Sequence, residues 1–216
     1  ITDLFSRVEK HGGLLRLDPQ VEPSMYRCAT VTTIELAQLR KISDIIRLGR
    51  VVAISQTEIT LTQGKVPTTP GTLHIDCTAD GLQRRPELPV FDGNTITLQT
   101  VRTCQQVFSA AFIAHIEASV TGHELKNELC TPVPHPDNAI DYMRANLGNM
   151  MNMQRWSLHD GLPHWLKHSR LDGFTDASQP APDLSDPKVA ERVASFARVG
   201  QAAVENVQRL LAEVDD

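Results

Sequence analysis

Residues 45–64 read IIRLGRVVAISQTEITLTQG, and this stretch decides the fold class that we expect. Its β-branched run ends at Ile54, an alternating segment covers residues 59–62, and Gln63-Gly64 has the composition of a turn. A period of two followed by a tight turn is typical of antiparallel strands. A further short apolar run, Leu73 to Cys77, follows. We therefore predict a small antiparallel meander that leads into a buried strand.

Toward the N-terminus the sequence predicts two short helices. Apolar residues at helical spacing place the first over Asp3 to His11, closed by Gly12-Gly13. Thr32 and Glu35 have the spacing of a capping box, which would start the second helix. The residues between these helices include two prolines and are expected to be irregular.

Toward the C-terminus two strand signals give way to helices. Val90-Phe91 and residues 95–101 are separated by the turn sequence Asp92-Gly93-Asn94. Helical periodicity then covers most of the remaining chain, with a Pro-, Ser- and Asp-rich linker near 174–186. The expected helices span residues 104–120 and 137–156, a short segment opening at Pro163, and residues 187–214. The fold class is thus α+β with a mostly helical C-terminal half, divided into residues 1–136 and 137–216.

The bulk composition excludes several classes of partner. The chain has 216 residues, 41% of them apolar and 22% charged, with a net charge of −5. Without a basic excess we expect no nucleic-acid partner. No run approaches the ~20 apolar residues of a membrane-spanning helix, so we expect no membrane partner and a cytoplasmic location. Its first residue is Ile1, which we interpret as the start of a segment of a longer polypeptide.

Four widely spaced cysteines contain no C-x-x-C pair, which argues against a zinc site and for free thiols in a reducing compartment. Burial of Cys77 in an apolar strand is favoured over a reactive thiolate. His164 and His168 share one helical face with His159 nearby, yet no Glu or Cys joins them locally. We expect no metal site. The methionines between 143 and 153 are interpreted as packing residues.

Three segments together resemble a known class of flavoproteins. They read GRVVAI (49–54), EITLTQG (58–64) and LHIDCTADG (73–81). Flavoproteins that bind FAD, and often NAD(P)H, in dinucleotide-binding folds have a similar meander followed by a strand whose end passes beside the dinucleotide. The wider resemblance, to bacterial FAD/NAD(P)-binding oxidoreductases, runs from about Gly12 to Pro136 and includes MYRCATV (25–31) and QTVRTCQQVFSAA (99–111).

The resemblance implies that this chain is the C-terminal part of an α/β dinucleotide-binding flavoprotein. In that family the upstream half carries the G-x-G-x-x-G loop against which FAD lies. No two glycines here have G-x-G spacing, so the phosphate-binding loop has to come from the upstream half of the same polypeptide.

The resemblance also implies a set of cofactor-binding residues. At the end of the predicted strand these are Asp76, Thr78, Ala79 and Gly81. At the junction before the next helix they are Gln99, Arg102, Thr103 and Gln105, with Thr103 as the N-cap and Arg102 beside the helix N-terminus, where a phosphate is favoured. Two departures weaken the match, because Thr78-Ala79 reverses the usual order and the family's later Gly-Asp pair is absent.

These positions also have simple structural interpretations. Residues Asp76 to Gly81 are equally compatible with an ordinary buried strand followed by a turn, and Arg102 is compatible with a surface ion pair. Tyr26 and Arg27 suit a substrate pocket or an irregular surface segment equally well. No catalytic acid or base can be named, and a serine hydrolase lacks its G-x-S-x-G signature. Two functions remain open. The first is an oxidoreductase that uses FAD and NAD(P)H on a small-molecule substrate. The second is a non-catalytic helical interaction or dimerisation module, and a homo-oligomer is compatible with either.

Overall fold

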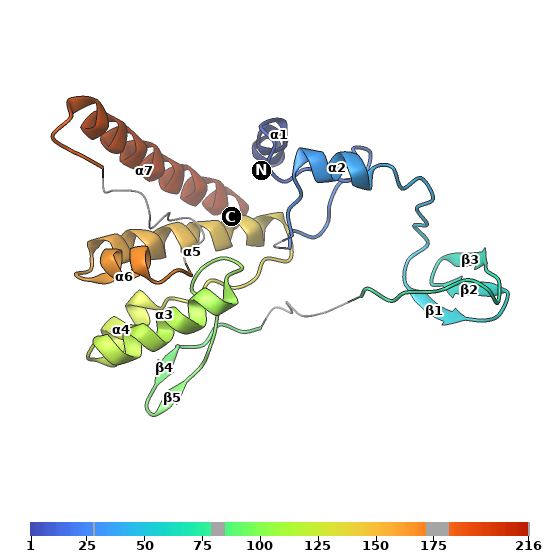
Figure 1. Ribbon diagram of the computed structural model, residues 1–216, viewed down its shortest axis with the longest axis horizontal. Coiled ribbons are helices and arrows are strands. Elements are labelled where there is room, and N and C mark those ends of the chain that lie inside the picture. The colour runs from blue at the N-terminus through green and yellow to red at the C-terminus, as the bar shows by residue number, and fades with distance from the viewer. Residues whose placement is uncertain (28, 79–84, 172–181, 216) are drawn as a thin grey trace. The chain divides into compact units, whose positions relative to one another are not determined.

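The computed structural model describes residues 1–27, 29–78, 85–171 and 182–215, and the chain forms two compact units (Figure 1). Unit 1 contains Ile1–Leu4, Pro23–Ala29 and Leu82–Asp216. Unit 2 contains Phe5–Glu22 and Thr30–Gly81. The domain boundary expected after Pro136 lies inside unit 1, because backbone and side-chain hydrogen bonds tie residues on both sides of it into one core.

Helices α1 (Thr2–Lys10) and α2 (Thr33–Leu39) agree with the sequence-based expectation. The capping box at the start of α2 is confirmed. Thr32 Oγ1 accepts a hydrogen bond from the Glu35 N–H at 3.2 Å, and the Glu35 carboxylate accepts one from the Thr32 N–H at 2.8 Å. These reciprocal bonds satisfy backbone donors that a helix start leaves without intrahelical partners.

The sheet of unit 2 is an antiparallel meander with strand order β1-β2-β3, as the sequence predicts. Its strands are β1 (Val51–Ile54), β2 (Glu58–Leu61) and β3 (Gly64–Pro67). Gly49 enters β1 with φ +81°, and a Cβ there would overlap the Thr62 side chain, so this position favours glycine.

The predicted strand over Leu73 to Cys77 is wrong. These residues belong to none of the described strands, and their side chains are exposed rather than buried. The third strand of the meander is instead β3, which begins at Gly64 immediately after the turn at Thr62-Gln63. Leu61 at the end of β2 pairs with Gly64 at the start of β3.

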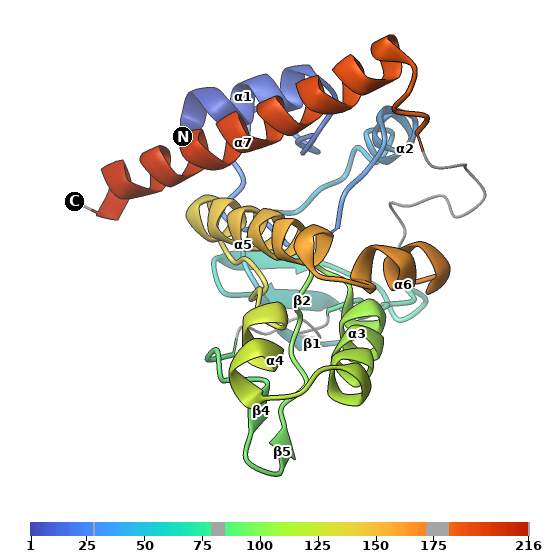
Figure 2. The same cartoon turned by 90° about the vertical axis from the view of Figure 1, so that its left-hand side faces the viewer.

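Unit 1 is built around the helix α5 (Ala139–Leu158). Figure 2 shows α7 (Pro187–Asp215) along one side of α5, with α3 (Gln106–Ser119) and α4 (His123–Leu129) on the other. The short helix α6 (Leu162–His168) follows α5 and has a proline in its first turn, as expected. The hairpin of β4 (Phe91–Asp92) and β5 (Thr95–Ile96) packs beside α4.

The core of unit 1 is aromatic and aliphatic. Phe112, Ile116 and Trp156 have no exposed surface, and the Phe112 and Trp156 ring centroids lie 4.4 Å apart. Buried aromatic pairs of this kind combine a large apolar contact area with favourable ring electrostatics.

Side chains of α5 hold two irregular segments against this core. Asn152 is fully buried and donates to the carbonyls of Val101 at 2.9 Å and Thr131 at 2.7 Å. The Trp156 indole N–H donates to the Leu129 carbonyl at 2.8 Å. The segments themselves are joined by Thr100 and Val133, whose backbone and side-chain hydrogen bonds are both 2.6 Å long. Buried backbone groups outside helices and strands are thereby satisfied.

The structure corrects three further expectations. The strand expected over 95–101 ends at Ile96, because residues 100–103 hydrogen-bond to α5 and Val133 instead of to a strand. The helix expected from Cys104 begins at Gln106. Cys77 and Cys130 are free, but Cys104 is disulfide-bonded, so the expectation of free thiols fails there: proximity in the fold, which cysteine spacing does not reveal, decides pairing.

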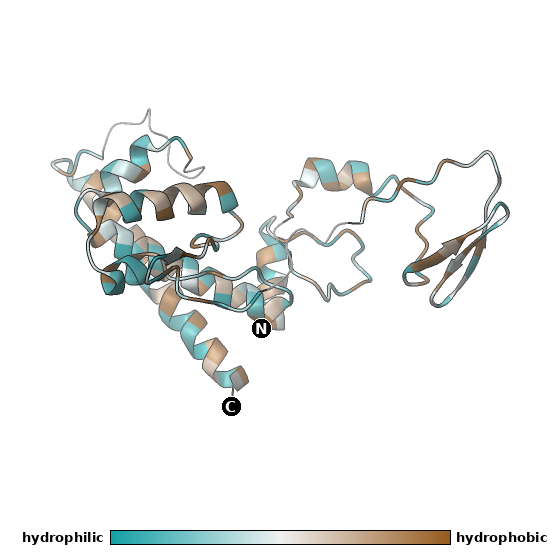
Figure 3. Ribbon diagram, turned by 90° about the horizontal axis from the view of Figure 1, so that it is seen from below, coloured by the Kyte–Doolittle hydropathy of each residue, from teal (hydrophilic) through white to brown (hydrophobic). Residues whose placement is uncertain are grey.

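None of the helices in the described parts of the chain is both long and apolar enough to cross a membrane. Hydrophobic and hydrophilic residues alternate along the 29 residues of α7 (Figure 3). The linker expected near 174–186 lies mostly outside the described residues.

Candidate functional site

In unit 2, the apolar segment of residues 73–77 is followed by Thr78, whose contacts with Asp76 form an exposed turn. The Asp76 carboxylate accepts hydrogen bonds from the Thr78 backbone N–H at 2.8 Å and the Thr78 hydroxyl at 2.6 Å. These bonds, the hydroxyl bond foremost, hold the pKa of Asp76 below its ordinary value. An ionised carboxylate and a hydroxyl are thus presented together to solvent. Ala79 and Gly81, predicted to lie at the same site, are outside the described residues.

The residues that lead to this turn are apolar and uncovered. Leu73 and Ile75 keep 82% and 74% of their surface exposed, and Cys77 is an exposed thiol rather than the buried one expected. These three residues alternate with polar ones, as in a strand buried on one face. Strand β1 is exposed as well, with its three large side chains Val51, Val52 and Ile54 each at least half exposed. Unit 2 therefore exposes large apolar side chains both on β1 and along residues 73–77.

The other predicted residues lie in unit 1, around the start of α3. The Gln99 side chain makes two hydrogen bonds to the backbone of Leu88. Its amide nitrogen donates to the Leu88 carbonyl at 2.6 Å, and its amide oxygen accepts from the Leu88 N–H at 3.1 Å. Both functional groups of Gln99 are used in fixing the chain. Its role in this conformation is structural.

Arg102 is 2% exposed, and its guanidinium lies over aromatic rings, 4.5 Å from the Phe108 centroid and 5.7 Å from the Trp156 centroid. The interpretation of Arg102 as a surface ion pair is therefore wrong. A cation in this position is stabilised by the faces of the rings. It would have to leave the core to meet an exposed phosphate.

Thr103 is not the N-cap of α3. Its N–H donates to the Asn149 side chain at 3.2 Å and its hydroxyl to the Ala145 carbonyl at 3.4 Å. Cys104 follows with a left-handed φ of +62°, which separates Thr103 from the helix, and Gln105 occupies the N-cap position without a side-chain cap hydrogen bond. The physical reason for the error is this left-handed turn, which the sequence does not signal.

Sequence reasoning missed His135, which lies near the start of α3. Its Nε2 atom is 3.3 Å from the Gln106 side-chain nitrogen, and Arg27 forms an ion pair with Asp137 at 2.7 Å. Burial, and then the positive charge of Arg27, lower the pKa of His135. Because the amide nitrogen can only donate, the contact requires an uncharged imidazole with its lone pair on Nε2.

This cluster brings residues from distant parts of the chain together. Arg27 precedes His135 by more than a hundred positions, so no local spacing could have found the pair. The Tyr26 N–H donates to the Asp137 carbonyl at 2.9 Å, which fixes the position of Arg27. The arrangement places an imidazole that is hydrogen-bonded to Gln106 near the Arg27–Asp137 ion pair.

The predicted site residues that the structure describes belong to two different units. Asp76 and Thr78 lie in unit 2, whereas Gln99, Arg102, Thr103 and Gln105 lie in unit 1. Only the first pair combines exposure with free acceptor capacity. Among the described residues no group of three or more His, Cys, Asp or Glu side chains is arranged to hold a metal ion.

Comparison with known proteins finds relatives in mycobacteria. Uncharacterized proteins of Mycobacterium tuberculosis (strain ATCC 25618 / H37Rv) and of Mycobacterium bovis (strain ATCC BAA-935 / AF2122/97) are each 54% identical to the chain over 195 residues. The matched region covers 90% of this chain but only 36% of each relative, so the chain spans about a third of their length. No family model matches the chain, and no solved structure matches it significantly.

Proposed function

We propose that this chain is part of a flavin-dependent oxidoreductase that uses FAD and NAD(P)H on a small-molecule substrate. Within it, unit 2 completes a dinucleotide-binding domain whose glycine-rich half lies elsewhere in the polypeptide. The mycobacterial relatives are long enough to contain such a half, since most of their length lies outside the matched region.

The observation that carries the proposal is the order of elements in unit 2. An antiparallel meander, β1-β2-β3, is followed by residues 72–78, which belong to no described helix or strand and are all exposed, with the apolar residues Leu73, Ile75 and Cys77 at alternate positions. Such a segment is suited to join a sheet, because both its backbone hydrogen bonds and its apolar side chains then become covered. The flavoproteins that the sequence resembles have a strand at this place.

The residues at the end of this segment fit a position beside FAD. Asp76 and Thr78 are exposed, and the Asp76 carboxylate keeps a second oxygen that can accept a hydrogen bond from a hydroxyl of a cofactor. Arg102 and Gln99 do not fit a phosphate site in this conformation, since one is buried among rings and the other is closed on Leu88. We therefore keep Asp76 and Thr78 as the proposed cofactor contacts.

When bound, FAD supplies the hydride and electron transfer of the reaction. The described residues would contribute binding and orientation. Asp76 would remain ionised at neutral pH, as its lowered pKa indicates, and would act as a hydrogen-bond acceptor rather than as a proton donor. Leu73, Ile75 and Cys77 would exclude water from the sheet that carries the cofactor.

The Cys77 thiol provides a direct experiment. In this chain Cys77 is exposed whereas Cys130 is fully buried and its pKa is raised to about 12, so a maleimide should modify Cys77 and spare Cys130. In the native full-length protein we expect Cys77 to be protected and the purified protein to carry flavin. Rapid modification of Cys77 in a folded, flavin-loaded full-length protein would contradict the proposal that residues 73–77 join a sheet as an additional strand. A folded full-length protein that neither carries nor binds FAD would contradict the flavin function itself.

One observation favours the alternative function, a helical interaction or dimerisation module. Along the N-terminal half of α7, Val193, Phe196 and Val199 are 41%, 82% and 65% exposed. Phe196 and Val199 lie on an open surface that they share with Pro187, Lys188, Glu191, Arg192 and Ser195 of the same helix. If this function were the whole role of the chain, Phe196→Glu should abolish self-association measured by sedimentation, and full-length protein should bind no flavin.

A further inference from the structure

We propose that the N-terminal half of α7 is a docking surface for an acidic, amphipathic helix of a separate partner protein. The surface is formed by Phe196 and Val199 together with the cations Lys188 and Arg192, and we call it the α7 patch. The inference is independent of the flavin function. It names a partner for the surface on which the alternative function depends.

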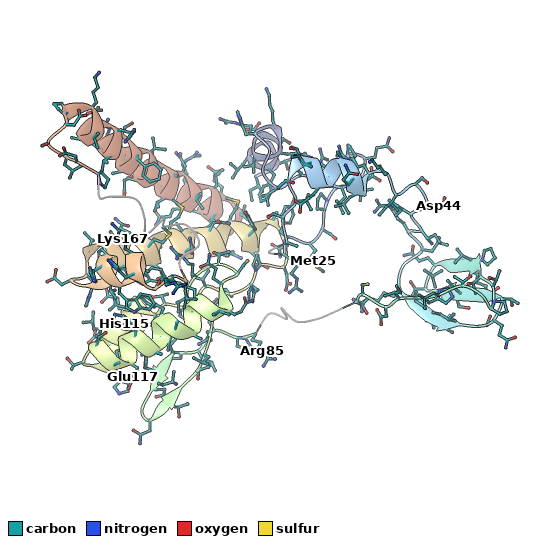
Figure 4. The ribbon with its side chains drawn as sticks, viewed as in Figure 1. Met25, Asp44, Arg85, His115, Glu117 and Lys167 are labelled. Carbon is teal, nitrogen blue, oxygen red and sulfur yellow. The ribbon has the colours of Figure 1, made fainter. Side chains whose placement is uncertain are left out.

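The apolar part of the α7 patch is not covered by the core of unit 1. Phe196 keeps 82% of its surface exposed and Val199 keeps 65%, whereas Leu211, near the other end of the same helix, is 7% exposed. Among the described helices and strands α7 contacts only α5. Figure 4 shows side chains that project from the N-terminal half of α7. An exposed aromatic ring with an aliphatic neighbour on one helix face is typical of an interaction site.

The charged part of the α7 patch consists of two cations whose neighbouring carboxylates are already engaged. Glu191 lies on the same surface and forms an ion pair with Arg198 at 2.7 Å. The Asp186 carboxylate accepts a hydrogen bond from the Lys188 backbone N–H at 2.8 Å and so caps the helix. The side chains of Lys188 and Arg192 form no ion pair with any residue that the structure describes. They are therefore available to carboxylates of a partner.

An amphipathic helix with acidic flanks matches both parts of the patch. Residues 188–199 span about three helical turns, which is the length over which two helices can pack side by side. Lys188 and Arg192 are one turn apart, so carboxylates one turn apart on the partner helix could pair with both. Phe196 and Val199 would meet the apolar face of that helix, as in other complexes in which an amphipathic helix is recognised.

The same charges disfavour two other occupants. In a symmetric dimer the same patch supplies both sides of the interface, so the Lys188 and Arg192 side chains of both copies would gather in one place. For an anionic membrane, two cations provide only a weak attraction, and the net charge of −5 on the chain opposes it. An acidic partner protein is therefore the occupant that the patch fits.

The test uses the full 216-residue chain and two fluorescently labelled synthetic peptides of about three heptads each. Both peptides carry leucine at positions a and d and alanine at b, c and f. One has glutamate at e and g and the other has lysine, and these like charges keep each peptide from pairing with itself. We expect the glutamate peptide to bind with a dissociation constant below about 100 μM in fluorescence anisotropy, and the lysine peptide to bind at least ~10-fold more weakly.

Variants of α7 locate the binding. Phe196→Ser and Arg192→Glu should each weaken binding of the glutamate peptide at least ~10-fold. Arg209→Glu makes the same charge change at an exposed position near the other end of α7, and its affinity should stay within about twofold of the parent. The double variant Lys188→Glu/Arg192→Glu should bind the lysine peptide more tightly than the parent does, which is a gain that misfolding would not produce.

Equal affinity of the parent for the two peptides, unchanged binding in Arg192→Glu, or no binding up to about 1 mM peptide would overturn the proposal. A dimer in sedimentation velocity that Phe196→Ser disrupts would assign the patch to a second copy and overturn it as well. The same holds for binding to vesicles of phosphatidylcholine and phosphatidylserine that Phe196→Ser abolishes. The full-length protein should also bind the glutamate peptide, and failure to do so would show that its own remaining residues cover the patch. Flavin content, which Phe196→Ser should leave unchanged, separates these outcomes from failure of the flavin function.

Discussion

Arg102 shows that the position of a residue in the chain does not reveal the surroundings of its side chain. Its place before a helix suggests a phosphate ligand, but the side chain is buried over the rings of Phe108 and Trp156. We predict that Arg102→Ala lowers the free energy of unfolding by about 2–4 kcal/mol, because the change leaves a cavity and removes a cation–ring contact. Urea denaturation measures this loss. Arg192→Ala, at an exposed position of α7, is the control and should change stability by less than about 0.5 kcal/mol. A similarly small effect of Arg102→Ala on the free energy of unfolding would show that the Arg102 side chain is not buried in the core.

His135 predicts a dependence of stability on pH. Its pKa is lowered in the folded state by burial and by Arg27, so the unfolded chain binds a proton first as the pH falls. The corresponding stability is fully present above the ordinary histidine pKa of about 6.5 and is lost as the pH decreases below it. His115, whose pKa burial also lowers, acts in the same direction. The lowered carboxylate pKa values of Glu35, Glu58, Asp76 and Asp183 affect stability only at lower pH.

We therefore expect stability to fall between pH 7.5 and 5.5, and to fall less in His135→Gln, which cannot be protonated. Urea denaturation at the two pH values measures the difference. His123→Gln, at an exposed position, should retain the full dependence of the parent. An identical pH dependence in the parent and in His135→Gln would show that the imidazole is not responsible.

Elements with local signals could be predicted, and those that depend on distant partners could not. The capping box, the meander, the Pro163 helix start and the long α7 all follow from spacings within a few residues. Residues 73–77 have the alternation of a strand, yet they pair with none of the described strands, and alternation alone does not specify a pairing partner. The start of α3 shifted because of the left-handed backbone at Cys104. The hydrogen bonds between Asp76 and Thr78 join residues two positions apart and are local, whereas the contact between His135 and Gln106 depends on the tertiary fold.

The capping box of α2 provides the prediction at the scale of an element. Thr32→Ala removes the acceptor for the Glu35 N–H and should cost about 1 kcal/mol of helix stability. Amide hydrogen exchange over residues 33–39 should accelerate accordingly. Thr33→Ala, which changes the first helical residue and leaves the cap in place, is the matched control and should exchange at nearly the parental rate. Equal protection in Thr32→Ala and in the parent would show that the hydrogen bond at 3.2 Å contributes nothing.

At the scale of the whole molecule, the predicted cofactor residues are divided between the two units, and no two glycines of the chain have G-x-G spacing. Dinucleotide-binding folds hold the pyrophosphate with backbone N–H groups of such a loop and of the helix that follows. Asp76 and Thr78 can supply hydrogen bonds to hydroxyls, but neither they nor the buried Arg102 supplies that cradle.

The 216-residue chain alone should consequently bind FAD weakly, with a dissociation constant above about 1 μM, which corresponds to about −8 kcal/mol. Titration followed by flavin fluorescence measures the affinity. The full-length protein should bind FAD more tightly, and Gly81→Val in the full-length protein should lower its flavin content if the backbone at residue 81 approaches the cofactor, since a β-branched side chain would hold it away. Melting temperature reports whether that variant is folded. Sub-micromolar binding by the isolated chain would show that the pyrophosphate cradle lies within these residues, and full flavin occupancy in a folded Gly81→Val variant would remove residue 81 from the cofactor site.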